Sequence, residues 1–263
     1  MITRRAGLMV LAAVVVGMVV VDLRLPPIPQ PLSYHQFADQ RSWLGIPNFG
    51  DVVSNIPFAI VGLLGLVFVL GSGQERLERC FVDGRERAFY VILFAGLVLT
   101  AFGSSYYHLH PDNARLVWDR LPMTIVFMSL IAALVAERIS LSAGLRLLPV
   151  LLLIGAGSVM QWYWSEMRGA GDLRFYATVQ AFSVVFLLVA LLFSPRYTRG
   201  ADLVVVAGFY VLAKALETYD RQVFRALHVV SGHTLKHLAA ACAGFWILRM
   251  LEKRRPIAGS ANQ

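Results

Sequence analysis

Apolar residues form long runs along this chain, and short polar or charged segments separate the runs. A helix needs about 20 mostly apolar residues to cross the roughly 30 Å hydrocarbon core of a bilayer. Runs of about that length predict helices at 6–22, 52–71, 88–109, 120–140, 146–165, 174–194, 202–218 and 232–251. The pattern therefore predicts an all-α fold, a polytopic transmembrane helix bundle with a seven-helix core and one N-terminal helix.

Most connections between the predicted helices are short, which favours one compact bundle. The exception is the proline-rich stretch between Asp22 and Asp51. We therefore divide the chain into an N-terminal anchor helix with a Pro-rich loop (1–44), a helical core (45–252) and a cytoplasmic tail (253–263) that is expected to be disordered.

The first apolar run also resembles a secretory signal peptide, because Arg4 and Arg5 precede it. Its end at Asp22 lacks a small-residue cleavage pattern, and the run is long for a signal peptide. An uncleaved anchor helix is the interpretation that these features favour.

Composition and charge agree with a membrane protein. Hydrophobic residues make up 57% of the 263 and charged residues only 15%, and the mean hydropathy is +0.64. The net charge of +8 comes from short basic clusters between apolar runs, so no nucleic-acid partner is indicated. Cys80 and Cys242 are far apart and show no CxxC spacing, which supports neither a disulfide framework nor a thiolate metal site.

The distribution of Lys and Arg predicts the orientation. Segments on the side of both termini hold 14 of these residues, and segments on the opposite side hold 8; Lys214 and Lys236 lie within predicted helices. Because short cytoplasmic loops carry the excess, both termini are predicted to be cytoplasmic.

Ionisable side chains in a bilayer are costly unless they are paired, bind metal or line a wet cavity. Here they gather in three segments. Ser104 and His108 stand at i and i+4 near the end of one predicted helix, Asp119 is near the start of the next, and His233 and His237 repeat the i, i+4 spacing at the start of the last. The number of crossings between these segments predicts that all five lie at the non-cytoplasmic face.

Three imidazoles and one open position make a tetrahedral catalytic zinc site. We therefore predict that His108, His233 and His237 bind Zn²⁺, which would activate water and polarise a substrate carbonyl. Asp119 is predicted to orient the water or carry its proton, and Ser104 to hydrogen-bond the developing oxyanion. As simpler alternatives, Asp119 is a helix N-cap and Ser104 bonds a carbonyl in its own helix.

Other polar and aromatic residues receive simpler interpretations. Lys214 and Glu217 are expected to form an ion pair, whereas Lys236 would reach the membrane surface or an anionic head group. An interfacial aromatic belt is expected at Trp162, Tyr163 and Trp164. The lone histidines near helix ends are expected to be interfacial residues; they are His35, His110 and His228. The polar residues that open the second predicted helix are expected to cap it or to support the site; they are Asn48, Asp51, Ser54 and Asn55.

The five site residues, with Asn48-Phe49-x-Asp51-x-x-Ser54-Asn55, resemble the alkaline ceramidase family. That family belongs to a superfamily with the adiponectin and progestin receptors and the Per1 lipid-remodelling proteins. The resemblance covers about residues 45–252. It implies a seven-helix core, three zinc-binding histidines and hydrolysis of the amide bond of a ceramide-like lipid. Animal ceramidases have acidic calcium ligands before the first core helix, and this chain has no clear counterparts.

Two further hypotheses follow from the same residues. One is a lipid esterase or phospholipase of the same superfamily. The other is a non-catalytic, receptor-like membrane protein with a structural zinc, although structural sites are normally closed by four protein ligands. A transporter with a His and Asp proton relay is less favoured, because no inverted repeat or broken helix is visible. The sequence does not define the oligomeric state.

Overall fold

The computed structural model describes residues 3–258, and its regular structure there is helical throughout. The described residues contain no strand, only two isolated bridges, at Trp43–Ile46 and Tyr197–Pro256. The predicted all-α class is therefore confirmed.

Eight long helices correspond to the eight predicted runs. They are α1 (Arg4–Arg24), α3 (Ile56–Gly71), α5 (Arg87–Leu109), α6 (Asn113–Arg138), α7 (Leu141–Met167), α8 (Arg174–Ala190), α9 (Asp202–Thr218) and α11 (Gly232–Lys253). The shorter elements are η1 (Leu32–His35), α2 (Phe49–Val53), α4 (Gln74–Glu78), η2 (Gly84–Glu86) and α10 (Asp220–Leu227).

Helix α6 begins seven residues before the predicted 120, because Asp112 caps it and accepts a hydrogen bond from the Arg115 amide at 2.7 Å. Asp119 therefore lies inside the helix, and its interpretation as an N-cap is wrong. Pro122, which follows, also lies inside α6.

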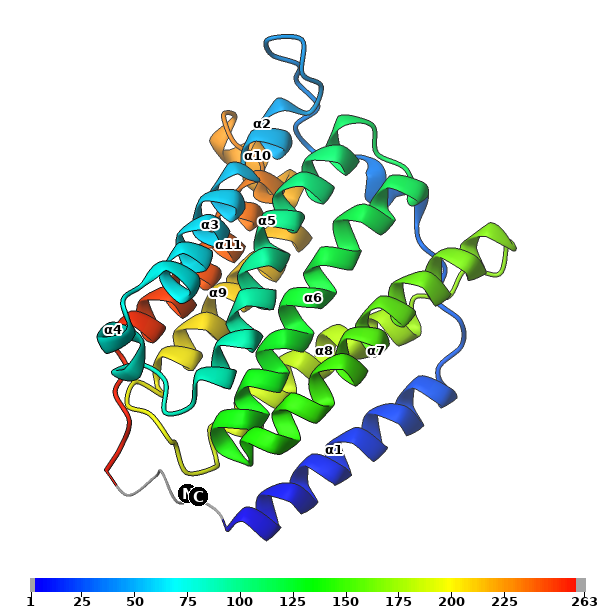
Figure 1. Ribbon diagram of the computed structural model, residues 1–263. Coiled ribbons are helices and arrows are strands. Elements are labelled where there is room, and N and C mark those ends of the chain that lie inside the picture. Colours follow the sequence, from blue (N-terminus) through cyan, green and yellow to red (C-terminus); the bar gives the residue numbers. More distant parts are fainter. Residues whose placement is uncertain (1–2, 259–263) are drawn as a thin grey trace.

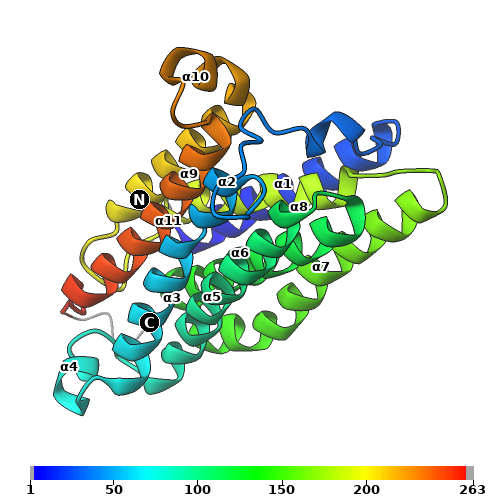
Figure 2. The same cartoon turned by 90° about the horizontal axis from the view of Figure 1, so that it is seen from above.

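Six helices close into a ring, in the order α3, α5, α6, α8, α9 and α11 (Figure 1). Helix α7 packs against α6 and α8 on the outside, and α1 runs along α8. Figures 1 and 2 show α2, α10 and the segment before α2 at the end of the bundle where α5 ends and α11 begins. This end of the ring holds the polar residues singled out in the sequence.

Within residues 3–258, five segments are long and apolar enough to cross a membrane. They are Arg4–Arg24, Phe49–Gly71, Gly84–Leu109, Asn113–Arg138 and Leu141–Met167. Helices α8 and α9 have 17 residues each, which corresponds to roughly 25 Å of helix. The several apolar helices are consistent with a multi-pass membrane protein, and the seven-helix count stays a prediction.

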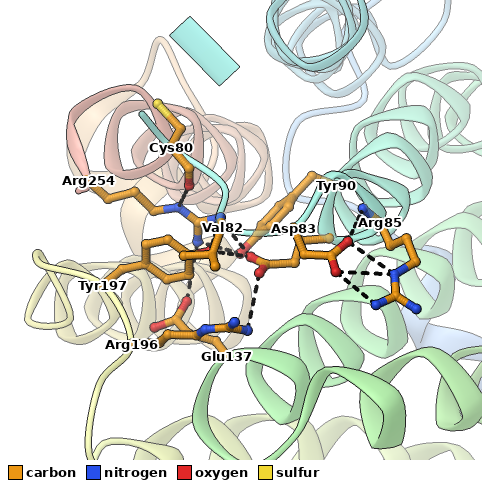
Figure 3. Close-up of polar contacts among 10 residues, drawn as sticks. Cys80, Val82, Asp83, Arg85, Tyr90, Glu137, Arg196, Tyr197 and Arg254 are labelled. Atoms are coloured by element: carbon orange, nitrogen blue, oxygen red, sulfur yellow. Dashed lines mark hydrogen bonds and ion pairs between the residues drawn. The ribbon is translucent and has the colours of Figure 1, made fainter. Parts of the chain in front are cut away.

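The first residues after α11 pack against the bundle instead of forming a disordered tail. Arg254 is 1% exposed, and its guanidinium donates to the Cys80 carbonyl at 2.8 Å and stacks 3.9 Å from the ring centre of Tyr197 (Figure 3). Buried carboxylates of Glu86 and Glu137 surround the same guanidinium. The expectation of disorder is therefore wrong for Arg254, while residues 259–263 lie outside the described part.

Candidate metal centre and adjoining cavity

Three buried histidines meet at one end of the helix ring. The ligand nitrogens of His108, His233 and His237 all lie within 4.8 Å of one another, and the side chains are 0%, 5% and 4% exposed. Nε2 of His108 is 3.3 Å from Nε2 of His233. Imidazole nitrogens in this arrangement could hold a metal ion, as the spacing in the sequence predicts.

Two helix ends position these rings. His108 lies in the last turn of α5, and His233 and His237 lie one turn apart at the start of α11. Ser231 caps α11 by accepting a hydrogen bond from the Thr234 amide at 2.9 Å. This cap fixes the first turn of α11, so that both of its histidines face α5.

The segment from Asn48 to Ser54 supports the three-histidine site. The Ser54 hydroxyl lies 2.8 Å from Nδ1 of His237, which leaves Nε2 of that ring for a metal ion. Asn48 donates to the carbonyl of His108 at 2.8 Å, although it makes no side-chain hydrogen bond as the N-cap of α2. Asn48 and Ser54 therefore contact the histidines directly, whereas the Asn55 side chain bonds only the carbonyls of Asp51 and Val52.

Asp51 binds two hydroxyl groups at the start of α11. Its side chain is completely buried and accepts hydrogen bonds from Thr234 at 2.7 Å and from Ser231 at 3.3 Å. These two hydroxyls flank His233 on α11. Asp51 therefore fixes the start of α11 against α2 and indirectly holds His233 in place.

Phe37 covers the histidines and was missed by sequence reasoning. Its ring centre lies 4.6 Å from those of both His108 and His233, and the side chain is 5% exposed. It comes from the loop before α2, where no periodic pattern marks a buried residue. An apolar ring over the imidazoles limits the access of water from this side.

Ser104 and Asp119 lie together beside the histidines. Ser104 is 1% exposed, and its hydroxyl acts on the carboxylate of Asp119 across the α5–α6 contact. Both residues and His237 line one cavity inside the helix ring. The five residues that the sequence singled out are therefore brought together.

The cavity has a volume of about 330 Å³ and is mostly apolar. Its walls come from α3, α5, α6, α8, α9 and α11, with α8 and α9 contributing facing rows of residues. Charged side chains occupy the wall near His237; they are Asp119, Arg120, Lys214, Glu217 and Lys236. A mostly apolar pocket with convergent polar groups is typical of a small-molecule site.

Two of these charged residues behave as expected, and one of the two roles expected for Lys236 is not seen. Lys214 forms the expected ion pair with Glu217. Lys236 does not extend to the membrane surface, because its ammonium lies 3.0 Å from a carboxylate oxygen of Glu217 and its side chain is 15% exposed. The buried partner on α9 provides better compensation for the charge than a long path to the surface would.

The expected aromatic belt is only partly right. Trp164 is 56% exposed, but Trp162 is completely buried beneath the guanidinium of Arg120, 4.1 Å from its ring centre. Of the lone histidines, His35 is half-buried and bridges Tyr107 and Asn113, with both contacts at 2.9 Å. His35 therefore attaches the proline-rich segment to α5 and α6.

No protein-family model matches this sequence, and no curated protein matches it either. The class of this protein is therefore described from its structure. The chain is an all-helical protein with several helices that could span a membrane, and it has a buried group of three histidines that could hold a metal ion.

Proposed function

We propose that this protein is a zinc-dependent integral membrane hydrolase that cleaves the amide bond of ceramide-like lipids. The observation that carries the proposal is the convergence of three buried histidines beside a cavity that also holds Ser104 and Asp119. Three protein ligands leave an open position, as in catalytic zinc sites.

The spacing of one pair of imidazole nitrogens is compatible with a tetrahedral zinc ion. Two nitrogen ligands about 2.0–2.1 Å from a tetrahedral zinc ion would lie about 3.3–3.4 Å apart. Nε2 of His108 and Nε2 of His233 are separated by 3.3 Å. The hydrogen bond between Nδ1 of His237 and the Ser54 hydroxyl, in which the ring donates because the hydroxyl proton goes to the Asp51 carbonyl, is the kind of outer contact that orients metal-binding imidazoles.

The residues beside the histidines suit amide hydrolysis. When bound, zinc lowers the pKa of water and polarises a carbonyl oxygen. Asp119 accepts the proton of the attacking water and passes it to the leaving nitrogen, so that the amide and water become a carboxylic acid and an amine. The hydroxyl of Ser104 donates a hydrogen bond to the carbonyl oxygen as negative charge develops there.

The apolar part of the cavity suits an acyl chain. It lies inside the ring, and its lining on α8 and α9 is mostly apolar or small. We further propose that α3, α5, α6, α7, α8, α9 and α11 all cross the membrane, with α1 as an added anchor. The bias of Lys and Arg supports cytoplasmic termini and a site at the non-cytoplasmic face.

The deciding experiment measures zinc content and fatty-acid release from ceramide with the detergent-purified protein. Wild type should hold one zinc per chain and release fatty acid, and His237→Ala should lose both. His110→Ala is the matched control, because this exposed histidine lies outside the metal site and its loss should change neither measurement.

A lipid ester with the same acyl chain is assayed in parallel. Faster release from the ester would favour the esterase hypothesis over amide hydrolysis. Zinc without release from either lipid would favour a receptor-like protein, and wild type without zinc would contradict the proposed mechanism.

A further inference from the structure

A group of charged residues at the polar end of the cavity takes no part in the proposed chemistry. The Glu217 carboxylate accepts from Lys236 at 3.0 Å and from the Tyr34 hydroxyl at 3.2 Å, and it also pairs with Lys214. Two ammonium groups therefore share one carboxylate. Within these three residues positive charge exceeds negative charge by one, and the carboxylate of Asp119 on the same cavity wall also acts on Lys236.

Lys236 is the member of this group that faces inward. Its side chain lines the cavity and is 15% exposed, whereas that of Lys214 is 51% exposed. An ammonium has three N–H donors. Within the described part of the chain, that of Lys236 makes one hydrogen bond, to Glu217.

The charges on the cavity wall also favour an anion. The lining contains three cationic side chains and two carboxylates, a balance of one positive charge; they are Arg120, Lys214 and Lys236 against Asp119 and Glu217. A metal ion at the histidines would add to this net positive charge. The ammonium groups of Lys236 and Lys214 both pair with the single carboxylate of Glu217, so a further anionic group beside Lys236 would be favoured in the apolar cavity.

The position of Lys236 defines where that anionic group would lie. Lys236 is three residues after His233 and directly before His237 on the same helix. Side chains three residues apart on a helix are neighbours, with Cβ atoms about 5–6 Å apart. Lys236 and His237 also line the same cavity, so a group held by Lys236 would share that cavity with a carbonyl held at the histidines.

We infer that Lys236 is a specificity-determining residue that selects N-acyl lipids with an anionic oxygen group, phosphate or carboxylate, close to the scissile amide. This inference rests on the proposed amide hydrolysis and narrows its substrate class. In this arrangement the cationic groups around Glu217 bind the anionic head of the lipid, and the apolar part of the cavity holds its acyl chain.

A purely structural role is the competing explanation, because the Lys236–Glu217 pair also joins α11 to α9. Such a role would affect neutral and anionic substrates equally. Lys214→Met provides the matched control, since it removes the same charge and another partner of Glu217 from the more exposed position.

The test compares three lipids with one acyl chain: ceramide, ceramide 1-phosphate and an N-acylglycine. Wild type should show a lower KM for one or both anionic lipids than for ceramide. Lys236→Met should raise that KM about tenfold or more without changing KM for ceramide, because a charge-assisted hydrogen bond is lost. Lys236→Arg should restore most of the preference, and Lys214→Met should have a smaller effect.

The two anionic lipids separate phosphate from carboxylate recognition. A wild type that prefers ceramide, or equal effects of Lys236→Met on all three lipids, would overturn the inference. Thermal stability and zinc content of each variant show whether the fold and the metal site are intact.

Binding is measured separately from turnover. Hexadecyl phosphate contains no amide, so its effect on Tm is independent of hydrolysis. It should raise the Tm of wild type more than hexadecanol does, and Lys236→Met should lose most of this difference. If no lipid is cleaved but this difference is seen, the anion site stands and the proposed function fails; if Lys236→Met keeps the difference, the anion site is wrong.

Discussion

The hydroxyl of Ser54 lies 2.8 Å from Nδ1 of His237, although the two residues are 183 positions apart. Ser54 follows α2, and His237 is in the second turn of α11. The contact fixes the ring and directs its other nitrogen toward His108 and His233. A residue outside the group of three histidines thus helps to arrange a site that could hold a metal ion.

Ser54→Ala should therefore weaken metal binding without unfolding the protein. Loss of an outer partner of a metal-binding histidine typically costs 10–100-fold in affinity. We expect a change of that size in the zinc dissociation constant, measured by competition with a chromogenic chelator.

Ser158→Ala is the control for this prediction. Ser158 is also fully buried, but its hydroxyl bonds the Gly155 carbonyl within α7, away from the histidines. It should leave zinc affinity unchanged. Equal affinities of Ser54→Ala and wild type would show that Ser54 does not position the imidazole.

Much of the site could be predicted because it depends on helical spacing. The i, i+4 pairs place Ser104 with His108 and His233 with His237, and the number of helices between them brings both pairs to one end. Phe37 could not be found in this way, because it lies in a loop and is buried only by contacts distant in sequence. Ser54 is expected to cap its helix or to support the site, but the sequence does not indicate that its partner is His237.

The errors have a related cause. The polar residues around Asp119 make the start of α6 resemble a loop, but Asp112 begins the helix and the cavity accommodates the polar groups. Trp162 belongs to a residue type that is common at membrane interfaces, and Arg254 to one that is common in exposed tails. In the folded protein both are buried, Trp162 against Arg120 and Arg254 against Tyr197. Hydropathy identifies apolar runs, whereas the pairing of buried charges depends on the folded structure.

Gly103 permits the close approach of α5 and α6 that places Ser104 beside Asp119. A Cβ at Gly103 would lie 2.0 Å from the Trp118 carbonyl oxygen, which is backbone and cannot rotate away. Gly103→Ala should therefore push the helices apart and lower the free energy of unfolding by about 1–3 kcal/mol. Under the proposed mechanism kcat should also fall, because Ser104 and Asp119 separate.

Gly157→Ala tests the same change where there is space. No atom lies within 4 Å of a Cβ added at this position in α7. Alanine should be neutral or stabilise the helix by up to about 1 kcal/mol. Denaturation of both variants in detergent checks the pair, and a similar effect at the two positions would contradict the role assigned to Gly103.

Arg254 neutralises two buried carboxylates at the end of the bundle opposite to the histidines, as Figure 3 shows for its surroundings. Arg254→Met should leave Glu86 paired only with Arg196 and Glu137 only with Arg138, and should destabilise the protein by about 1.5–3 kcal/mol. The adjacent Lys253 is exposed, so Lys253→Met should change stability by no more than about 0.5 kcal/mol. Equal stabilities of the two variants in a denaturant titration would show that the buried arginine makes no net contribution.

Asp39 connects the proline-rich segment to the start of α11. Its carboxylate binds the Arg41 guanidinium at 2.8 and 2.7 Å, and Arg41 donates to the Val229 carbonyl at 2.6 Å, four residues before His233. The hydrogen bonds from Arg41 hold the pKa of Asp39 below its usual value. A lowered pKa in the folded state stabilises the protein above the unfolded pKa of about 3.9 and ceases to do so as the pH falls through the folded value.

Asp39→Asn should therefore lower Tm at pH 7 and at pH 5, and the difference from wild type should shrink below about pH 4, where protonation of Asp39 breaks the same pair. Glu75→Gln is the control, because Glu75 and Arg79 form a surface pair with side chains 90% and 66% exposed. Its Tm should match that of wild type throughout. If the difference in Tm between Asp39→Asn and wild type is constant from pH 7 to pH 3, the carboxylate acts through its shape and not through its charge.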